Sequence, residues 1–171
     1  MFLAVLFTIL VTYVVAELIG YLFHRAAHIP GTKLYKSHMM HHLDAYPPSR
    51  FASEKYISIG GNSFVYWFIP LFLLFLGAQF LILSPIMFGV SAATTGLVAF
   101  VNFYVHDTYH LSGNPFAGTK FFKRLTDYHH VHHRNMKKNF GIYSFFIDRL
   151  FGTFRSPLEL HASDSSKAKS K

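Results

Sequence analysis

The chain has 171 residues, of which 51% are hydrophobic and 18% aromatic, and its net charge is +8. This length suits one compact domain and hardly two. The absence of cysteine excludes disulfides, thiolate-bound metals and iron–sulfur clusters. Such an apolar composition in a short chain indicates a lipid environment rather than a soluble core.

The first predicted element is an apolar run from Phe2 to Phe23, interrupted by Glu17. A helix rises about 1.5 Å per residue, so this run can span a hydrocarbon core of roughly 30 Å. A signal peptide cleaved near Ala16 is the alternative. However, no basic residue precedes the run and a histidine cluster follows it directly, so we expect a retained membrane helix.

Two further apolar runs extend from Phe64 to Leu83 and from Ile86 to Val105. The Ser84-Pro85 pair between them favours a tight turn, so the two runs predict a transmembrane hairpin. A buried helix pair of a soluble protein is the alternative. Two neighbouring runs of spanning length argue against it.

All lysines and arginines lie in two blocks, Arg25 to Lys55 and Lys120 to Lys171. The positive-inside rule places both blocks in the cytosol, which predicts three spans with the N-terminus outside. The histidine clusters fall on the same cytosolic side. Because this topology accounts for the basic charge, we predict a membrane partner and no nucleic-acid partner.

The C-terminal part predicts two more helices and a tail. Thr119 to His133 predicts a helix that ends in histidines, and the apolar spacing in Asn139 to Phe154 predicts an amphipathic helix. This second helix would lie at the membrane interface or pack on the cytosolic cap. Residues 162–171 predict a disordered basic tail, which leaves residues 1–161 as one domain.

Four short clusters contain every histidine except His161. Two clusters have the form H-x3-H and two contain H-x2-H-H, and residues at these spacings share one face of a helix. Each cluster therefore predicts imidazoles that point toward one place. The clusters are His24-Arg-Ala-Ala-His28, His38-Met-Met-His41-His42, His106-Asp-Thr-Tyr-His110 and His129-His130-Val-His132-His133.

Ten of these histidines are predicted metal ligands, and His130 falls outside the repeating pattern. Ten imidazoles exceed one tetrahedral zinc site but suit two metals of five- or six-fold coordination. Imidazole binds zinc, copper, iron and nickel, so the residues alone leave the metal open. The predicted ligands are His24, His28, His38, His41, His42, His106, His110, His129, His132 and His133.

Several polar residues are candidates to support the ligands, and no further catalytic side chain is predicted. Glu17 lies about 10 Å before His24 along a helix, too far for an obvious co-ligand. Because it is ionisable within a span, we interpret it as a residue of a substrate channel or a support of the ligands, with a structural role as the alternative. The other candidates are Asn102, Asp107, Asp127 and Asn139.

The most specific pattern is the fourth cluster followed by Asn139-Phe-Gly141 and Asp148-Arg-Leu-Phe-Gly-Thr153. It resembles the C-terminal end of the fatty acid hydroxylase superfamily, which includes sterol desaturases and sphingolipid hydroxylases, and the resemblance covers His24 to about Phe154. The resemblance implies an all-α integral membrane protein with a four-helix-type bundle and a cytosolic histidine-rich cap. It also implies two iron ions held by the ten histidines, and O2-dependent hydroxylation or desaturation of a lipid C–H bond.

Two alternatives stay open. The compact layout also resembles carotenoid ring hydroxylases, although these commonly have H-x4-H and lack the Asp-Arg-Leu-Phe-Gly-Thr ending. A metal carrier or a metal-stabilised membrane protein is the non-enzymatic alternative. A carrier usually places its ligands at the middle of the membrane, whereas no histidine here lies inside a span.

Electrons would come from a separate protein, because no nucleotide-binding glycine motif is present. The resemblance favours cytochrome b5 or a ferredoxin as this donor. A basic patch would steer an acidic carrier or anchor the chain to anionic lipid; it comprises Lys120, Lys123, Arg124, Lys137 and Lys138. The lysine-rich end resembles a retrieval signal for the endoplasmic reticulum, and a bacterial inner membrane fits the topology equally.

Overall fold

The computed structural model describes residues 1–58 and 63–159, with side chains described outside 63–67. In this part of the chain every regular element is helical, which confirms the predicted all-α fold. The elements are α1 (Phe2–Ala27), α2 (Lys33–Met40), the π-helix η1 (His41–Ala45), the 3-10 helix η2 (Pro48–Arg50), α3 (Ser63–Ile82), α4 (Pro85–Tyr109), α5 (Lys120–Arg134) and α6 (Phe146–Leu150). The predicted tail, 162–171, lies outside the described residues.

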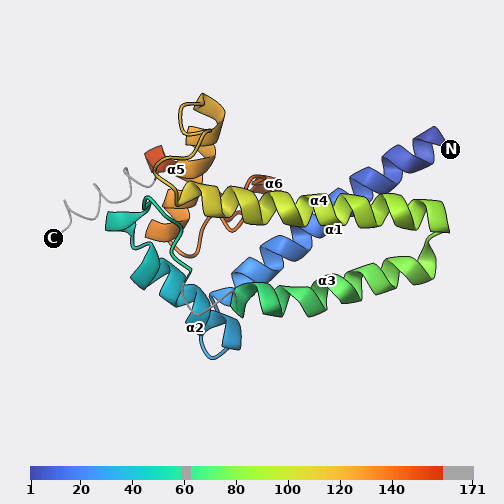
Figure 1. Ribbon diagram of the computed structural model, residues 1–171, viewed down its shortest axis with the longest axis horizontal. Helices are drawn as coiled ribbons and strands as arrows, with labels where there is room; N and C mark the ends of the chain where they lie inside the picture. The colour runs from blue at the N-terminus through green and yellow to red at the C-terminus, as the bar shows by residue number, and fades with distance from the viewer. Residues whose placement is uncertain (59–62, 160–171) are drawn as a thin grey trace.

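Three long helices form the body of the molecule. Helices α3 and α4 run antiparallel as a hairpin and α1 packs on α4 (Figure 1). The turn falls where Ser84-Pro85 predicted it, because Pro85 occupies the first turn of α4, where a missing N–H costs nothing. On the α1–α4 contact, the hydroxyl groups of Thr12 and Ser91 lie 2.6 Å apart.

Two of these helices are long and apolar enough to cross a membrane. They are α1 and α4, with mean hydropathies of 2.4 and 1.7. Much of their apolar surface is exposed, as at Leu10 and Phe100, which are 60% and 64% exposed. A helix that is apolar on its outer face suits a hydrocarbon environment. The described side chains of α3 cover a shorter apolar stretch, Phe68–Ile82, so the third span stays a prediction.

The shorter elements gather at the end of the bundle opposite the α3–α4 turn (Figure 1). Helix α5 starts where predicted, because the Thr119 hydroxyl accepts a hydrogen bond from Phe122 N at 3.2 Å and caps the helix. Its apolar face packs Phe122 and Leu125 against Tyr109 of α4 and Phe145. This packing holds the histidine-bearing end of α5 beside the ends of α1 and α4.

The predicted amphipathic helix over Asn139 to Phe154 is wrong, because only Phe146–Leu150 is helical. Asn139 has a φ of 54°, which interrupts a right-handed helix. The backbone N–H groups of Phe140 and Gly141 donate to the Asp148 carboxylate at 2.8 and 2.7 Å instead of to helical carbonyls. The segment is therefore a loop followed by one short helix, and Asp148 of that helix holds the loop.

Candidate metal centre

The ten predicted ligands come from the ends of five helical elements. His24 lies in the last turn of α1 and His28 is its C-cap, while His106 and His110 occupy the same places on α4. The remaining ligands lie on α2, on η1 and in the last two turns of α5. Because these ends meet in the cap, the chain brings all four clusters together.

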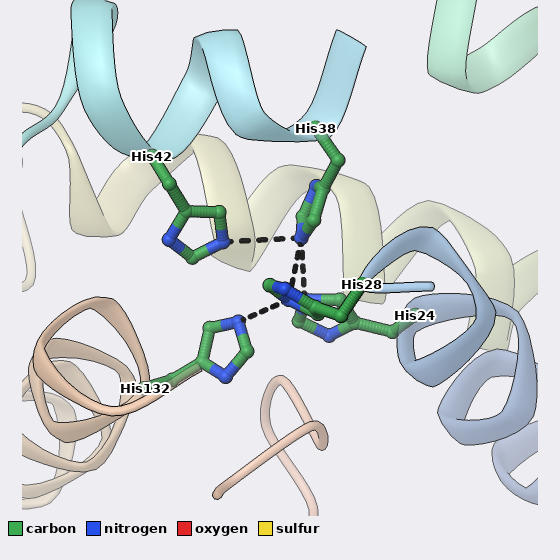
Figure 2. A group of neighbouring side chains, drawn as sticks. All are labelled: His24, His28, His38, His42 and His132. Atoms are coloured by element: carbon green, nitrogen blue, oxygen red, sulfur yellow. Dashed lines mark hydrogen bonds between the residues drawn. The ribbon is translucent and has the colours of Figure 1, made fainter. Parts of the chain in front are cut away.

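The histidines form two groups, within each of which the nearest ring nitrogens lie within 4.8 Å of one another. Figure 2 shows the first group, whose side chains point toward one another from α1, from α2 and η1, and from α5. The first group is His24, His28, His38, His42 and His132, and the second is His41, His106, His110 and His129. We refer to them below as the first and second histidine groups.

His133 lies between the two groups. Its ring centroid is 4.1 Å from that of His42 in the first group and 4.8 Å from that of His110 in the second. Its Nε2 is buried and has no hydrogen-bond partner among the described residues. All ten predicted ligands are thus in one continuous cluster. That they bind metal stays a prediction.

Each H-x2-H-H cluster divides between the two groups, whereas the helical spacing predicted one common direction. His38 and His42 enter the first group and His41 the second. The physical reason is that His41 and His42 begin a π-helix, which has a wider turn than an α-helix and redirects neighbouring side chains. Likewise, His129 and His132 of α5 belong to different groups.

The first group has the geometry of a cation site rather than of a hydrogen-bond network. His38 Nε2 lies 3.1 Å from His24 Nε2, 2.9 Å from His28 Nε2 and 3.0 Å from His42 Nε2. A ring nitrogen carries one proton or one lone pair, so it cannot make three hydrogen bonds with three other imidazoles. Lone pairs that converge in this way suit a bound metal ion.

Backbone carbonyls fix the orientation of four imidazoles. In each case Nδ1 donates to the carbonyl, which leaves the Nε2 lone pair free for a metal. The pairs are His24 with Phe140 O at 2.6 Å, His132 with Lys138 O at 2.7 Å, His110 with Phe51 O at 2.7 Å and His133 with Tyr46 O at 2.8 Å.

The surroundings keep the imidazoles neutral, which is the form that binds metal. Burial lowers the pKa of His28 from 6.5 to about 4 and that of His133 to about 3. Burial and neighbouring histidines lower the pKa of His129 well below its usual value. Within the part of the chain that the structure describes, the buried His41 Nε2 has no hydrogen-bond partner, as expected for a nitrogen that binds a ligand. The residues therefore fit metal ions in both groups.

The loop that carries Lys138 O and Phe140 O is held by Asn139 and Asp148. Asn139 Nδ2 donates to Tyr128 O and Arg155 O at 2.9 and 2.8 Å, and its Oδ1 accepts from Arg155 N at 2.7 Å. Asp148 also accepts from the Thr153 hydroxyl at 2.7 Å. Both side chains are fully buried. They act on the first group indirectly, through the two carbonyls beside Asn139.

The two aspartates predicted to support the ligands, Asp107 and Asp127, lie in different surroundings. Asp107 Oδ1 lies 3.4 Å from His106 Nδ1, whereas Asp127 lies on the surface with its carboxylate 3.4 Å from Lys123 Nζ. His130, outside the repeating pattern, contacts Pro48 O at 3.3 Å near the surface. Sequence reasoning missed Asp148 and the carbonyls that orient the imidazoles. The Asn-Phe-Gly and Asp-Arg-Leu-Phe-Gly-Thr motifs were the signal for the loop, but they did not reveal which atoms it presents.

A cavity of about 300 Å³ opens beside both histidine groups. Its lining includes His24 and His38 of the first group and His41 and His106 of the second. Away from the histidines it continues between α1, α3 and α4, where most of its wall is apolar. Glu17 and Asn102 also line this part, and Asn102 Nδ2 donates to Glu17 Oε1 at 3.0 Å.

The fold and site define a helical protein with two histidine groups suited to metal ions beside an apolar cavity. Residues 9–153 match the sequence model of the fatty acid hydroxylase family, and the chain belongs to that family. This confirms the resemblance found in the sequence. Its apolar helices and its sterol desaturase relatives indicate a membrane protein.

Two curated relatives are sterol desaturases. The chain is 34% identical to a Delta(7)-sterol-C5(6)-desaturase of Nicotiana tabacum over 79 residues, which cover 46% of this chain and 27% of the relative. It is 32% identical to a Delta(7)-sterol 5(6)-desaturase of Candida glabrata over 145 residues, which cover 80% of this chain and 33% of the relative. The matched segments thus span a third of the relatives or less. No solved structure is significantly similar to the chain.

Proposed function

We propose that this protein is a membrane-bound di-iron oxygenase that hydroxylates or desaturates a C–H bond of a lipid, with O2 as co-substrate. The observation that carries the proposal is the position of the cavity, which joins both histidine groups to an apolar space between long helices. Membership of the fatty acid hydroxylase family and similarity to two sterol desaturases support it. The proposed substrate is a fatty acyl, sphingolipid or sterol lipid.

Two iron ions would supply the activation of O2 that cleavage of an unactivated C–H bond requires. The ten histidines are the proposed ligands, with His133 between the two groups. Their number favours two metals of high coordination over a structural zinc site. Imidazole is also a suitable ligand for iron.

The other residues of the site exclude water and hold the ligands in place. Phe68, Phe72 and Phe103 line the cavity, and an apolar wall limits side reactions of an oxidising centre. The carbonyls of Lys138 and Phe140 keep His132 and His24 in the tautomer that presents Nε2. An apolar substrate would enter laterally from the bilayer between the helices.

The proposed topology has three spans, α1, α3 and α4, with the histidine groups in the cytosol. The distribution of lysine and arginine supports this orientation, because both basic blocks flank the cap. The membrane would be the endoplasmic reticulum in a eukaryote or the inner membrane in a bacterium. Tagging the N-terminus and the Lys55 loop with single reactive cysteines tests the orientation, since the chain has none of its own. Labelling of both sites from the same side of the membrane would refute it.

The electron donor would be a separate protein of the cytochrome b5 or ferredoxin type. Lys120, Arg124 and Lys137 are exposed on the cap and present positive charge to an acidic carrier. Reversing these three charges should raise the apparent KM for the donor and leave the iron content unchanged. Reversal of Lys55, which is exposed on another loop, is the control. An unchanged KM in the triple variant would exclude this docking surface.

The function is tested by lipid profiling of a host that expresses the chain with a donor and its reductase, compared with the His132→Ala variant. We expect a lipid that gains one oxygen or loses two hydrogens, present only with the unaltered chain. Purified protein should contain iron. Unchanged lipids together with zinc or readily exchanged metal would instead identify a structural metal site or a metal carrier.

A further inference from the structure

Glu17 and Asn102 form a polar pair in the cavity wall, between α1 and α4. Glu17 is 6% exposed and lies on α1, and Asn102 lies opposite on α4. Asn102 Nδ2 donates both of its hydrogens, to Glu17 Oε1 and to Val98 O, each at 3.0 Å. A buried ionisable residue within a membrane helix is costly, and such residues usually serve a function.

The pair offers acceptors to the cavity and no free amide hydrogen. Among the described residues, none donates a hydrogen bond to Asn102 Oδ1, and the Nδ2 hydrogens are already used. The Glu17 carboxylate adds a second acceptor beside it. This carboxylate also accepts a hydrogen bond from the hydroxyl of Tyr143, which is not among the residues of the cavity wall. A molecule in the cavity would therefore meet acceptors that require a donor.

Packing of α1 against α4 does not explain the Glu17–Asn102 pair. A second polar contact between α1 and α4, Thr12 with Ser91, joins two hydroxyl groups at 2.6 Å. Both of these residues are fully or nearly fully buried, and neither lines the cavity. They satisfy each other, whereas Glu17 and Asn102 face an open space. The Thr12–Ser91 contact is therefore a matched control within the same helix pair.

Glu17 and Asn102 lie about one to two helical turns away from the nearest histidines of their own helices. Glu17 precedes His24 by two turns of α1, which is about 10 Å along the helix axis, and Asn102 precedes His106 by about one turn of α4. A lipid in the cavity would thus reach the polar pair and the histidines with two different parts of its structure.

We propose that Glu17 and Asn102 bind a hydroxyl group of the lipid substrate and so hold a remote C–H bond at the histidine groups. This inference rests on the proposed function and names its substrate class, a lipid alcohol. The hydroxyl donates to the pair in an apolar, water-poor space, where an unmet acceptor is expensive. An ether of the same lipid has no hydrogen to donate and is expected to bind at least about tenfold more weakly.

The test measures equilibrium binding to the purified, metal-loaded protein in lipid nanodiscs. The probes are a sterol and its methyl ether, and a long-chain alcohol and its methyl ether. We expect the unaltered protein to prefer at least one alcohol over its ether by about tenfold or more. Glu17→Gln should narrow this preference, because the carboxamide is similar in shape but adds a donor for the ether. Thr12→Val should leave the preference unchanged.

Equal affinity for alcohol and ether in the unaltered protein would overturn the inference. An unchanged preference in both Glu17→Gln and Asn102→Leu would overturn it too. Iron content and thermal unfolding show whether each variant is folded. If Asn102→Leu is not folded, the isosteric Glu17→Gln variant still provides the test. Lipid conversion is assayed separately, so that conversion without an alcohol preference rejects only this inference, and a preference without any conversion rejects the proposed function.

Discussion

The His24 ring donates from Nδ1 to the carbonyl oxygen of Phe140 at 2.6 Å, although the two residues are 116 positions apart in the chain. One metal-directed imidazole on the first helix is thus oriented by a loop near the C-terminus. The Lys138 carbonyl in the same loop orients His132. The Asn-Phe-Gly motif is therefore part of the first histidine group through its backbone.

Asp148→Asn is expected to weaken the first histidine group without touching a ligand. The carboxylate accepts hydrogen bonds from Phe140 N, Gly141 N and Thr153 Oγ1, and an amide can accept on only one side. The loop carbonyls would then hold the imidazoles less firmly, and loss of such support typically costs about 10- to 100-fold in metal affinity. Chelator competition measures this change. Asp127→Asn, at an exposed carboxylate, is the control, and equal affinities of the two variants would contradict the role of Asp148.

Asp148 should also give the protein a particular pH dependence. Burial raises its pKa above 3.8, and its hydrogen bonds oppose this rise. The pKa of Asp148 is higher in the folded state than in the unfolded chain. Asp148 therefore stays protonated to a higher pH in the folded state. The contribution of this group to the free energy of unfolding is therefore complete below about pH 3.8 and is lost as the pH rises through the folded-state pKa.

This dependence is measured as the difference in unfolding midpoint between the unaltered protein and Asp148→Asn, in detergent over a series of pH values. The difference should shift in favour of the unaltered protein toward acidic pH. A difference that stays constant with pH would show that Asp148 has the same pKa in both states.

Gly141→Ala is expected to destabilise the loop by steric conflict. A Cβ at this position would lie 2.9 Å from Asp148 Oδ2 and closer still to the Ser144 carbonyl oxygen, which is backbone and cannot easily move. Overpacking of this kind costs about 1–3 kcal/mol. Gly89→Ala is the matched control, because a Cβ there meets none of the described atoms within 4 Å. The thermal unfolding midpoint should be lower for Gly141→Ala than for Gly89→Ala. Similar midpoints would mean that the loop shifts to accommodate the added Cβ.

His132→Ala should lower the metal content and abolish activity, because His132 is fully buried in the first group and contacts His28 Nε2 at 3.1 Å. His130→Ala should change neither, since His130 lies near the surface against Pro48 O. The two positions belong to the same cluster, so the pair separates ligation from a general effect on α5. Elemental analysis with an activity assay makes the comparison. Full metal content in His132→Ala would remove it from the ligand set.

The sequence predicted the elements whose signals are local. The apolar runs, the Ser84-Pro85 turn and the helix that starts at Thr119 all appear where expected. The loop from Asn139 did not, because the apolar spacing there resembles a helix while a positive φ and the buried Asp148 fix a different backbone. Tertiary contacts between distant segments decide that conformation, and periodicity does not report them.

The candidate site was predicted as a list of residues but not as an arrangement. Spacing identified the ten histidines, and the structure brings them together. Their division into two groups depends in part on the π-helix at His41, which the local sequence pattern did not predict, and in α5 it occurs within an ordinary α-helix. The groups that orient the imidazoles are mostly backbone carbonyl oxygens. Every residue has one, so residue types alone do not predict which carbonyls take this role.

The first histidine group draws His24 from α1 and His132 from α5, with His38 and His42 between them. During synthesis the ribosome completes α1 to α4 before it adds His132, which lies on α5. A nascent chain in the membrane would thus have an incomplete first histidine group until α5 is synthesised. Metal loading of the proposed centre would then be a late event, and a premature stop before α5 would give a product that lacks His129, His132 and His133.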